Sequence, residues 1–274
     1  MKQQFAVTQT PSSASPKLSA IERDRRLDGE GMIERLPFTI KRVETADDMR
    51  KAVQVRHAAY ARHVPAFAAT LASPEEADYD DDSIVLLAES KLDGSPLGST
   101  RIQTNLLGPL HVEQSIALPD WLRGVRLAEV TRLGIDESRM GRMVKIALIK
   151  ACFEYCENNH IEHAVVTGRP PIDRQYEQLM FRDVFDDKAY VPLHHVGNIP
   201  HRVMAFEIAT GEARWSAAGH PLLKFFKHTR HPDIDIGKKS ATRLRASAPA
   251  FATEFAADFV PELARLRRRS LVSA

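Results

Sequence analysis

The stretch RLAEVTRLGID, from Arg126 to Asp136, most constrains what this chain can fold into. Its apolar content predicts a buried strand, yet the carboxylate of Glu129 and the guanidinium of Arg132 lie within it. A regular strand sends residues three apart to opposite faces of its sheet. The fold must therefore hold two charged side chains in the middle of a core strand.

The amino-acid composition limits the classes of protein to which this chain can belong. The chain has 274 residues, 43% hydrophobic and 27% charged, which is ordinary for a globular protein with a sizeable core. A formal net charge of +2 gives no indication of nucleic-acid binding. We find no apolar signal-peptide core and no run of about 18 apolar residues, so we expect a cytoplasmic protein. Cys152 and Cys156, four apart in a helical pattern, are interpreted as buried helix thiols.

Three regions are expected along the chain. Residues 1–35 are rich in Gln, Ser, Thr, Pro and charge, which is typical of a flexible arm. Residues 36–236 form the α/β body. Residues 237–274 hold eight Lys/Arg against three Asp/Glu, a net of +5. There the phenylalanines at 251, 255 and 259 predict an amphipathic helix, with two interpretations open: packing on the body, or binding a membrane surface or a partner.

The pattern of the body predicts one mixed α/β domain, with the secondary-structure elements in the order β-α-β-β-β-α-β-α-β-β along the chain. Thr45 with Asp48 predicts the capping box of the first helix. Asp93-Gly94 predicts a hairpin turn. The expected strands cover residues 38–43, 83–90, 96–104, 127–135, 162–168, 189–196 and 201–209, and the expected helices cover residues 45–64, 142–159 and 170–185.

Four groups of charged residues lie along this body. They are Arg56 in VRHAAY, Asp78 and Asp80 in ADYDDD, Arg101 in GSTRIQT, and Glu129 with Arg132 in AEVTR. Taken singly, each has a structural explanation, such as a buried ion pair or a solvated loop.

Together the four groups resemble the acyl-homoserine-lactone synthases and the related long-chain N-acyl amino acid synthases. The resemblance spans about residues 38 to 185 and rests on VRHAAYARH, DYD, a strand arginine and EVTRLGID. It implies the GNAT acyltransferase fold, with a mostly antiparallel sheet splayed between strands 4 and 5 and extra C-terminal helices. A β-bulge in strand 4 is implied as well, which would let Glu129 and Arg132 face one cleft.

The resemblance also implies site roles. Glu129 is the candidate base that deprotonates an amine, and Tyr176 in YEQLMF is a candidate acid for the leaving thiolate, with core packing as its alternative. The acceptor pocket would comprise Arg56, Asp78, Asp80, Arg101 and Arg132. The gap beside strand 4 would admit an acyl-pantetheine arm between Leu127, Val130, Thr131, Val165 and Val166.

The residues at the start of the central helix bear on the identity of the acyl donor. SRMGRMVK has Gly141, but Met143 stands where a phosphate-binding loop of acetyltransferases has a small residue, which disfavours coenzyme A. Arg139, Arg142 and Lys145 would form a basic rim for an acidic acyl carrier protein, although solvated helix-start charge explains them as well.

The sequence thus predicts an N-acyltransferase that moves a long fatty acyl group from acyl carrier protein to the α-amine of an amino acid. Acyl-CoA stays open as the co-substrate, and no permanently bound cofactor is expected. Three alternatives remain: a lactone synthase using S-adenosylmethionine, an acyltransferase that modifies a protein or an exported polymer, and a non-catalytic module that binds acyl thioesters or a carrier protein. His228 and His231 in KHTRH have ligand-like spacing but no matching ligand set, so no metal is expected.

Overall fold

The computed structural model describes residues 32–237. Its helices are α1 (Ala46–Ala61), α2 (Pro65–Ala68), α3 (Gly141–Asn158), α4 (Ile172–Gln178), α5 (Gly211–Ala217) and α6 (Leu223–Lys227). Its strands are β1 (Met32–Ile33), β2 (Phe38–Arg42), β3 (Ser83–Ser90), β4 (Pro96–Thr104), β5 (Leu127–Ile135), β6 (His163–Gly168), β7 (Arg182–Asp183), β8 (Val191–Leu193), β9 (Ile199–Glu207), β10 (Thr229–Arg230) and β11 (Ile234–Asp235). Short 3-10 turns include η2 (Glu76–Asp78), η3 (His111–Gln114) and η5 (His194–Val196).

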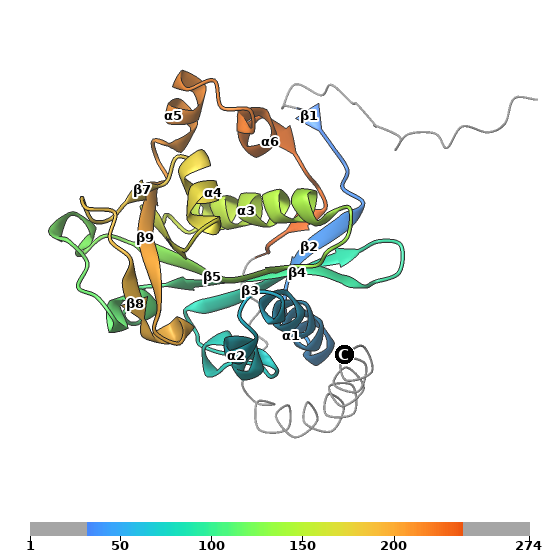
Figure 1. Ribbon diagram of the computed structural model, residues 1–274. Helices are drawn as coiled ribbons and strands as arrows, with labels where there is room; N and C mark the ends of the chain where they lie inside the picture. Colours follow the sequence, from blue (N-terminus) through green and yellow to red (C-terminus); the bar gives the residue numbers. More distant parts are fainter. Residues whose placement is uncertain (1–31, 238–274) are drawn as a thin grey trace, which may run out of the picture.

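One large sheet has the order β11-β2-β3-β4-β5-β6-β9-β7, and β8 pairs with β9. The meander β2-β3-β4-β5 is antiparallel, β5 and β6 are parallel, and β6 and β9 are antiparallel. Helices cover both faces: α1 and α2 lie on one, α3 and α4 on the other (Figure 1). The predicted mixed α/β class is confirmed.

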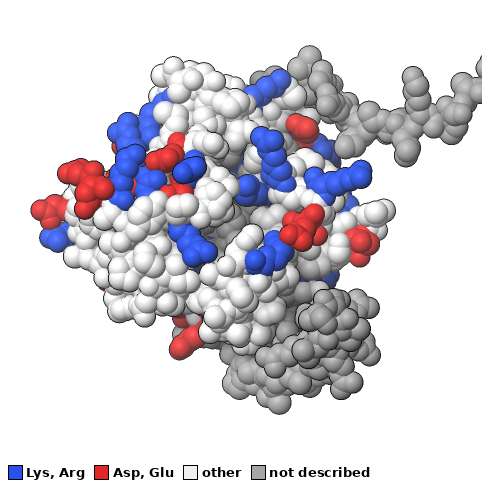
Figure 2. Space-filling model, in the orientation of Figure 1, with Lys and Arg blue, Asp and Glu red and all other residues white. Residues whose placement is uncertain are grey.

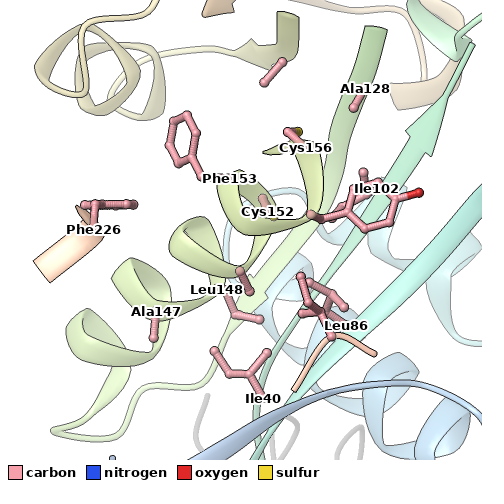
Figure 3. Packing of buried hydrophobic residues seen from close by; sticks show 14 of the residues in the cluster. Ile40, Leu86, Ile102, Ala128, Ala147, Leu148, Cys152, Phe153, Cys156 and Phe226 are labelled. Atoms are coloured by element: carbon pink, nitrogen blue, oxygen red, sulfur yellow. The ribbon is translucent and has the colours of Figure 1, made fainter. Parts of the chain in front are cut away.

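The main core lies between the sheet and α3. Helix α3 is apolar around most of its circumference, as expected for a helix buried on several sides. Its Leu148 and Cys152 pack towards the side chains of Ile40 on β2 and Ile102 on β4, while Phe153 points away from them to the side of Phe226 (Figure 3). Cys152 and Cys156 are both buried and unpaired, in agreement with their interpretation as helix-core thiols.

Strand β5 carries a bulge at Arg132. Ser99 of β4 pairs with Gly134 of β5, and Arg101 of β4 pairs with Thr131 of β5. The single residue between Ser99 and Arg101 therefore lies opposite two residues of β5. Arg132 has a left-handed φ of 56°, which accommodates the extra residue. The bulge that the resemblance implied is present, and it turns both Glu129 and Arg132 to the α1 face.

Strands β5 and β6 pair only over their first halves. Their register runs from Leu127↔His163 to Val130↔Val166, and β5 continues to Ile135 without β6 beside it. This separation confirms the predicted splay, because β5 and β6 are the fourth and fifth long strands of the body.

Two predicted elements are wrong in extent. The helix expected over residues 170–185 ends at Gln178, because Met180 adopts a left-handed φ of 69° and the chain then pairs as β7 with β9. The strand expected over residues 189–196 stops at Leu193, where the 3-10 turn η5 begins. Gly197, with φ of 72°, closes that turn.

The ends of the described region add to the body. Met32 and Ile33, within the expected arm, pair with β10, and α5 and α6 follow the sheet. The predicted helix of the tail lies outside the described residues. Within residues 32–237, no helix is long and apolar enough to cross a membrane.

Gly134 sets how closely α1 approaches β5. A Cβ atom on Gly134 would lie 2.8 Å from the Cα atom of Arg56, and backbone cannot move aside as a flexible side chain can. We expect Gly134→Ala to lower the free energy of unfolding by about 1–3 kcal/mol, the usual cost of overpacking a core. Urea denaturation checks this.

Gly108→Ala is the matched control, because a Cβ atom there would meet nothing within 4 Å. Its unfolding free energy should equal that of the wild type or exceed it slightly. Equal stabilities of the two variants would contradict the close approach of α1 to β5.

Candidate functional site

A buried ion-pair network lies between α1 and the bulged strand. Arg56 of α1 donates hydrogen bonds from both terminal nitrogens to Asp78, over 2.9 Å from Nη1 to Oδ1 and 2.6 Å from Nη2 to Oδ2. Arg101 of β4 donates Nη1 to the same Oδ1 at 3.2 Å. Asp78 has a fully buried side chain, and the two guanidinium groups outweigh its burial and lower its pKa to about 2. Asp78 is therefore ionised throughout the neutral range.

Glu75 is the acidic partner that the sequence analysis missed. It accepts hydrogen bonds from Arg132 Nε at 2.6 Å and Nη2 at 2.7 Å, and from Arg101 Nη1 at 3.1 Å. Glu75 and Asp78 are three apart around η2, and Asp78 Oδ2 also accepts from the Glu75 N–H at 2.9 Å. The arginines thus pair with the acids at 75 and 78, whereas Asp80 lies outside this network.

Arg132 connects the network to the turn η5. Its Nη2 also donates to the main-chain oxygen of His195 at 2.7 Å, and its guanidinium lies over the ring of Phe67. Its Nη1 is buried and has no hydrogen-bond partner in the described region. Arg56 Nε and Arg101 Nε in the same network also have no partner there. A buried donor of this kind is costly to leave unpaired.

Glu129 is fully buried beside this network. Its Oε2 accepts a hydrogen bond from the N–H of Val112 at 3.1 Å, and its Oε1 lies 3.5 Å from Nε2 of His195. Burial raises the pKa of Glu129 to about 7, and the nearby charges of Arg101 and Arg132 offset only part of the effect. The carboxyl group can therefore exchange a proton near neutral pH.

Two histidines complete the surroundings of Glu129. The rings of His111, on η3, and His195, on η5, have centroids 6.0 Å apart. Burial and the charges of Arg101 and Arg132 lower the pKa of both rings. The sequence analysis assigned neither, because the spacing of residues 111, 129 and 195 gives no sign of their contact.

An apolar pocket opens on the other face of the sheet, beside the gap between β5 and β6. Val130 and Val166, both predicted for the acyl-pantetheine site, line it, whereas Leu127 and Val165 pack in a second core. Alternate residues of a strand face opposite sides, which separates the two pairs. Thr131 is buried next to Arg132 with an unpaired hydroxyl. The other lining residues are Thr100, Leu133, Leu148, Ile149, Cys152, Phe153, Ala164, Tyr176, Leu179 and Phe181.

Tyr176 lines this pocket from α4. Its ring lies 5.6 Å from that of Phe181, centroid to centroid, and burial raises the pKa of its hydroxyl. The structure thus places Tyr176 at the pocket wall, as both of its expected roles require.

The predicted basic rim is at the start of α3. Arg139 and Arg142 are exposed, and Lys145 is half-buried and donates to Gln175 Oε1 at 2.7 Å. Lys and Arg side chains are more frequent than Asp and Glu over the α3 region of the face in Figure 2. Met143 packs in part against the main core.

The two histidines of KHTRH have separate partners. His228 is exposed beside Glu212, while His231 is buried with its Nδ1 2.9 Å from Lys150 Nζ. In residues 32–237, no three His, Cys, Asp or Glu side chains gather as a potential metal site.

Comparison with known proteins agrees with this geometry. The family model "N-acyl amino acid synthase FeeM" matches residues 43–205, more than half of the 274 residues. The chain belongs to this family. It is accordingly an acyltransferase, and the predicted resemblance to the N-acyl amino acid synthases is confirmed. A sequence search of curated proteins finds no match.

The chain is similar to several solved structures. FeeM from uncultured soil microbes, an N-acyl amino acid synthase, superposes with a TM-score of 0.52 at 17% identity, over 69% of this chain and 96% of that one. The CoA-dependent acyl-homoserine lactone synthase BjaI gives 0.48 at 15% identity, over 77% and 99%. The ribosomal-protein-S18-alanine N-acetyltransferase of Escherichia coli gives 0.41 at 16% identity, over 62% and 94%. At these identities the similarity concerns the fold alone.

Asp78 is expected to be essential for stability. In Asp78→Asn, Arg56 would lose the carboxylate that it binds through two hydrogen bonds, and Arg101 would keep only Glu75. Breaking a buried ion pair in this way typically costs about 3–5 kcal/mol. Chemical denaturation at pH 7 should show this loss. Asp80→Asn is the control, and a loss of the same size there would contradict the network as described.

Glu129 is expected to lower stability at high pH. Its folded-state pKa of about 7 exceeds the ordinary glutamate value of 4.5, so the folded state binds more protons between these values and stability falls as pH rises through them. Glu129→Gln has no such charge, and its Oε1 can still accept from Val112. The free energy of unfolding of the variant should exceed that of the wild type by on the order of 3 kcal/mol at pH 8 and equal it at pH 4.5. Thermal unfolding at both pH values checks the sign.

Proposed function

We propose that this N-acyltransferase transfers a long fatty acyl group from acyl carrier protein to the α-amine of an amino acid. The observation that carries the proposal is the juxtaposition of Glu129, which ionises near neutral pH, with the unpaired Nη1 of Arg132. A proton acceptor and a carboxylate-binding group are the two features that an α-amino acid needs in its acceptor site.

The charge of the site supports an amino acid as acceptor. Arg56, Arg101 and Arg132 carry three positive charges against two on Glu75 and Asp78, which leaves one in excess. The substrate carboxylate would bind Arg132, and its ammonium group would face Glu129 once that group is ionised. Thr131, whose buried hydroxyl has no partner in the described region, would add a polar contact.

The arrangement of the two faces supports transfer from a thioester. The apolar pocket lies on the α3 face and the charged network on the α1 face. The sheet between them is interrupted beyond Val130 and Val166, where β5 and β6 part. A thioester in this gap would have its acyl chain on the apolar side and its carbonyl carbon beside the acceptor amine.

The chemistry follows from these positions. Glu129 takes a proton from the substrate ammonium, which leaves a nucleophilic amine. The amine nitrogen attacks the thioester carbonyl carbon, the C–N bond forms and the C–S bond breaks. The second amine proton ends on the departing sulfur, for which Tyr176 is the proposed proton carrier. The products are an N-acyl amino acid and the free thiol.

The test is mass spectrometry of lipid extracts from cells that express the wild type or Glu129→Gln. Wild-type cells should accumulate an N-acyl amino acid, and the variant should reduce it by about 10²- to 10⁴-fold, the usual contribution of a general base. Equal folded abundance is verified by purification. No new acyl amide in either culture would refute the proposal, and release of methylthioadenosine would instead indicate a lactone synthase.

The donor is tested by charge reversal. With Arg139→Glu and Arg142→Glu combined, the KM for acyl carrier protein thioester should rise about tenfold or more, because steering by complementary charge is lost. The KM for the amino acid should stay the same. Arg50→Glu, on α1 across the sheet, is the matched control. If the enzyme turns over acyl-CoA as fast as the acyl carrier protein thioester, and the double variant leaves the KM for both donors unchanged, then coenzyme A is the donor carrier.

A further inference from the structure

The side chain of His195 lies inside the site with its ring nitrogens unpaired. The side chain is 4% exposed, and its Nε2 is 3.5 Å from Oε1 of Glu129. Within residues 32–237, neither ring nitrogen has a hydrogen-bond partner by geometry, and neither does Oε1 of Glu129. A small approach of the two side chains would satisfy both groups at once.

The backbone, rather than the ring, fixes the position of this histidine. Arg132 Nη2 donates to the His195 carbonyl oxygen at 2.7 Å, and the N–H of His194 donates to Ser115 Oγ at 2.8 Å. Gly197 closes the turn in the left-handed region. The imidazole nitrogens are thus left available for Glu129.

The surroundings keep the imidazole neutral. Burial comes first among the causes that lower the pKa of His195 to about 3, followed by the charge of Arg132. A neutral imidazole has one N–H donor and one acceptor nitrogen, and either nitrogen can carry the proton. The charged and titratable groups that face it are Glu129, Arg132, Arg101, His111 and His201.

We propose that His195 is a positioning residue that holds Glu129 by a hydrogen bond in both protonation states, by exchanging one imidazole tautomer for the other. With Glu129 ionised, Nε2–H donates to Oε1. With Glu129 protonated, Oε1–H donates to Nε2 and the ring proton is on Nδ1. The second state holds one proton more than the first: Oε1 gains the proton that Glu129 takes up, and the ring keeps a single proton, which moves from Nε2 to Nδ1.

This arrangement has a consequence for the reaction, and here the inference rests on the proposed role of Glu129 as the base. Oε2 is held by the Val112 N–H, so a partner at Oε1 fixes the plane of the carboxyl group. The orientation of the base towards the amine is then the same before and after proton transfer. Misplacement of a catalytic group by about 1 Å can cost on the order of 10²-fold in rate.

The decisive experiment is ¹⁵N NMR of the histidine side chains in the full-length protein between pH 5.5 and 8.5. The His195 signals, assigned with His195→Phe, should change from the Nδ1–H to the Nε2–H pattern as pH rises, with a midpoint near that of Glu129. In Glu129→Gln the pH-dependent change should disappear. An imidazolium pattern, or one tautomer at every pH in the wild type, would overturn the proposal.

Kinetics provide the second readout. His195→Phe should lower kcat about tenfold to a hundredfold and leave the KM for the amino acid unchanged, because Arg132 keeps its partners. His194→Phe, on the same turn but exposed, is the control and should keep wild-type kcat. An unchanged kcat in His195→Phe would contradict the positioning role. The NMR result needs no turnover, so it decides the tautomer exchange even if no acyl amide is formed.

Discussion

The site depends on the bulge at Arg132. Without the extra residue in β5, Glu129 and Arg132 would face opposite sides of the sheet, one of them in the apolar core. With it, the carboxyl group and the guanidinium share the α1 face, and Arg132 reaches both Glu75 and the main-chain oxygen of His195. One left-handed residue therefore joins the acidic turn, the bulged strand and the turn η5 into a single site.

The sheet separates the two kinds of chemistry. Apolar side chains of α3 and α4 line one face, and buried charges occupy the other. Strands β5 and β6 stop pairing between these two faces, after Val130 and Val166. A continuous parallel pairing would instead join the two strands by backbone hydrogen bonds along their whole length. The incomplete pairing is thus as much a part of the site as its side chains.

Buried polar groups lower the stability of the fold around the site. Glu129 lies in a setting that raises its pKa, and Nη1 of Arg132 and the ring nitrogens of His195 have no partner by geometry in the described region. Each such group costs free energy in the folded state. The aromatic core around Phe153, Phe206 and Trp215 on the α3 side offsets this cost with contacts that do not involve the charged network.

Much of the framework follows from local sequence. The helix start at Thr45, the Asp93-Gly94 turn and the long strands and helix of the body each rest on neighbouring residues, and they occur where predicted. Predictions of extent were wrong where tertiary pairing decides. β9 recruits residues 182–183 as a strand after α4, and Gly197 closes η5 where a strand was expected.

The sequence, through its resemblance to a known family, predicted one site for Arg56, Asp78, Asp80, Arg101, Glu129 and Arg132, and all of these except Asp80 are buried. Only the tertiary structure decided which acids pair with the arginines, and that His195 lies beside Glu129. The reason is physical. A buried charge takes the partner that the packing of distant segments brings within hydrogen-bonding distance, and Glu75 and His195 are 57 and 63 residues from Arg132 along the chain.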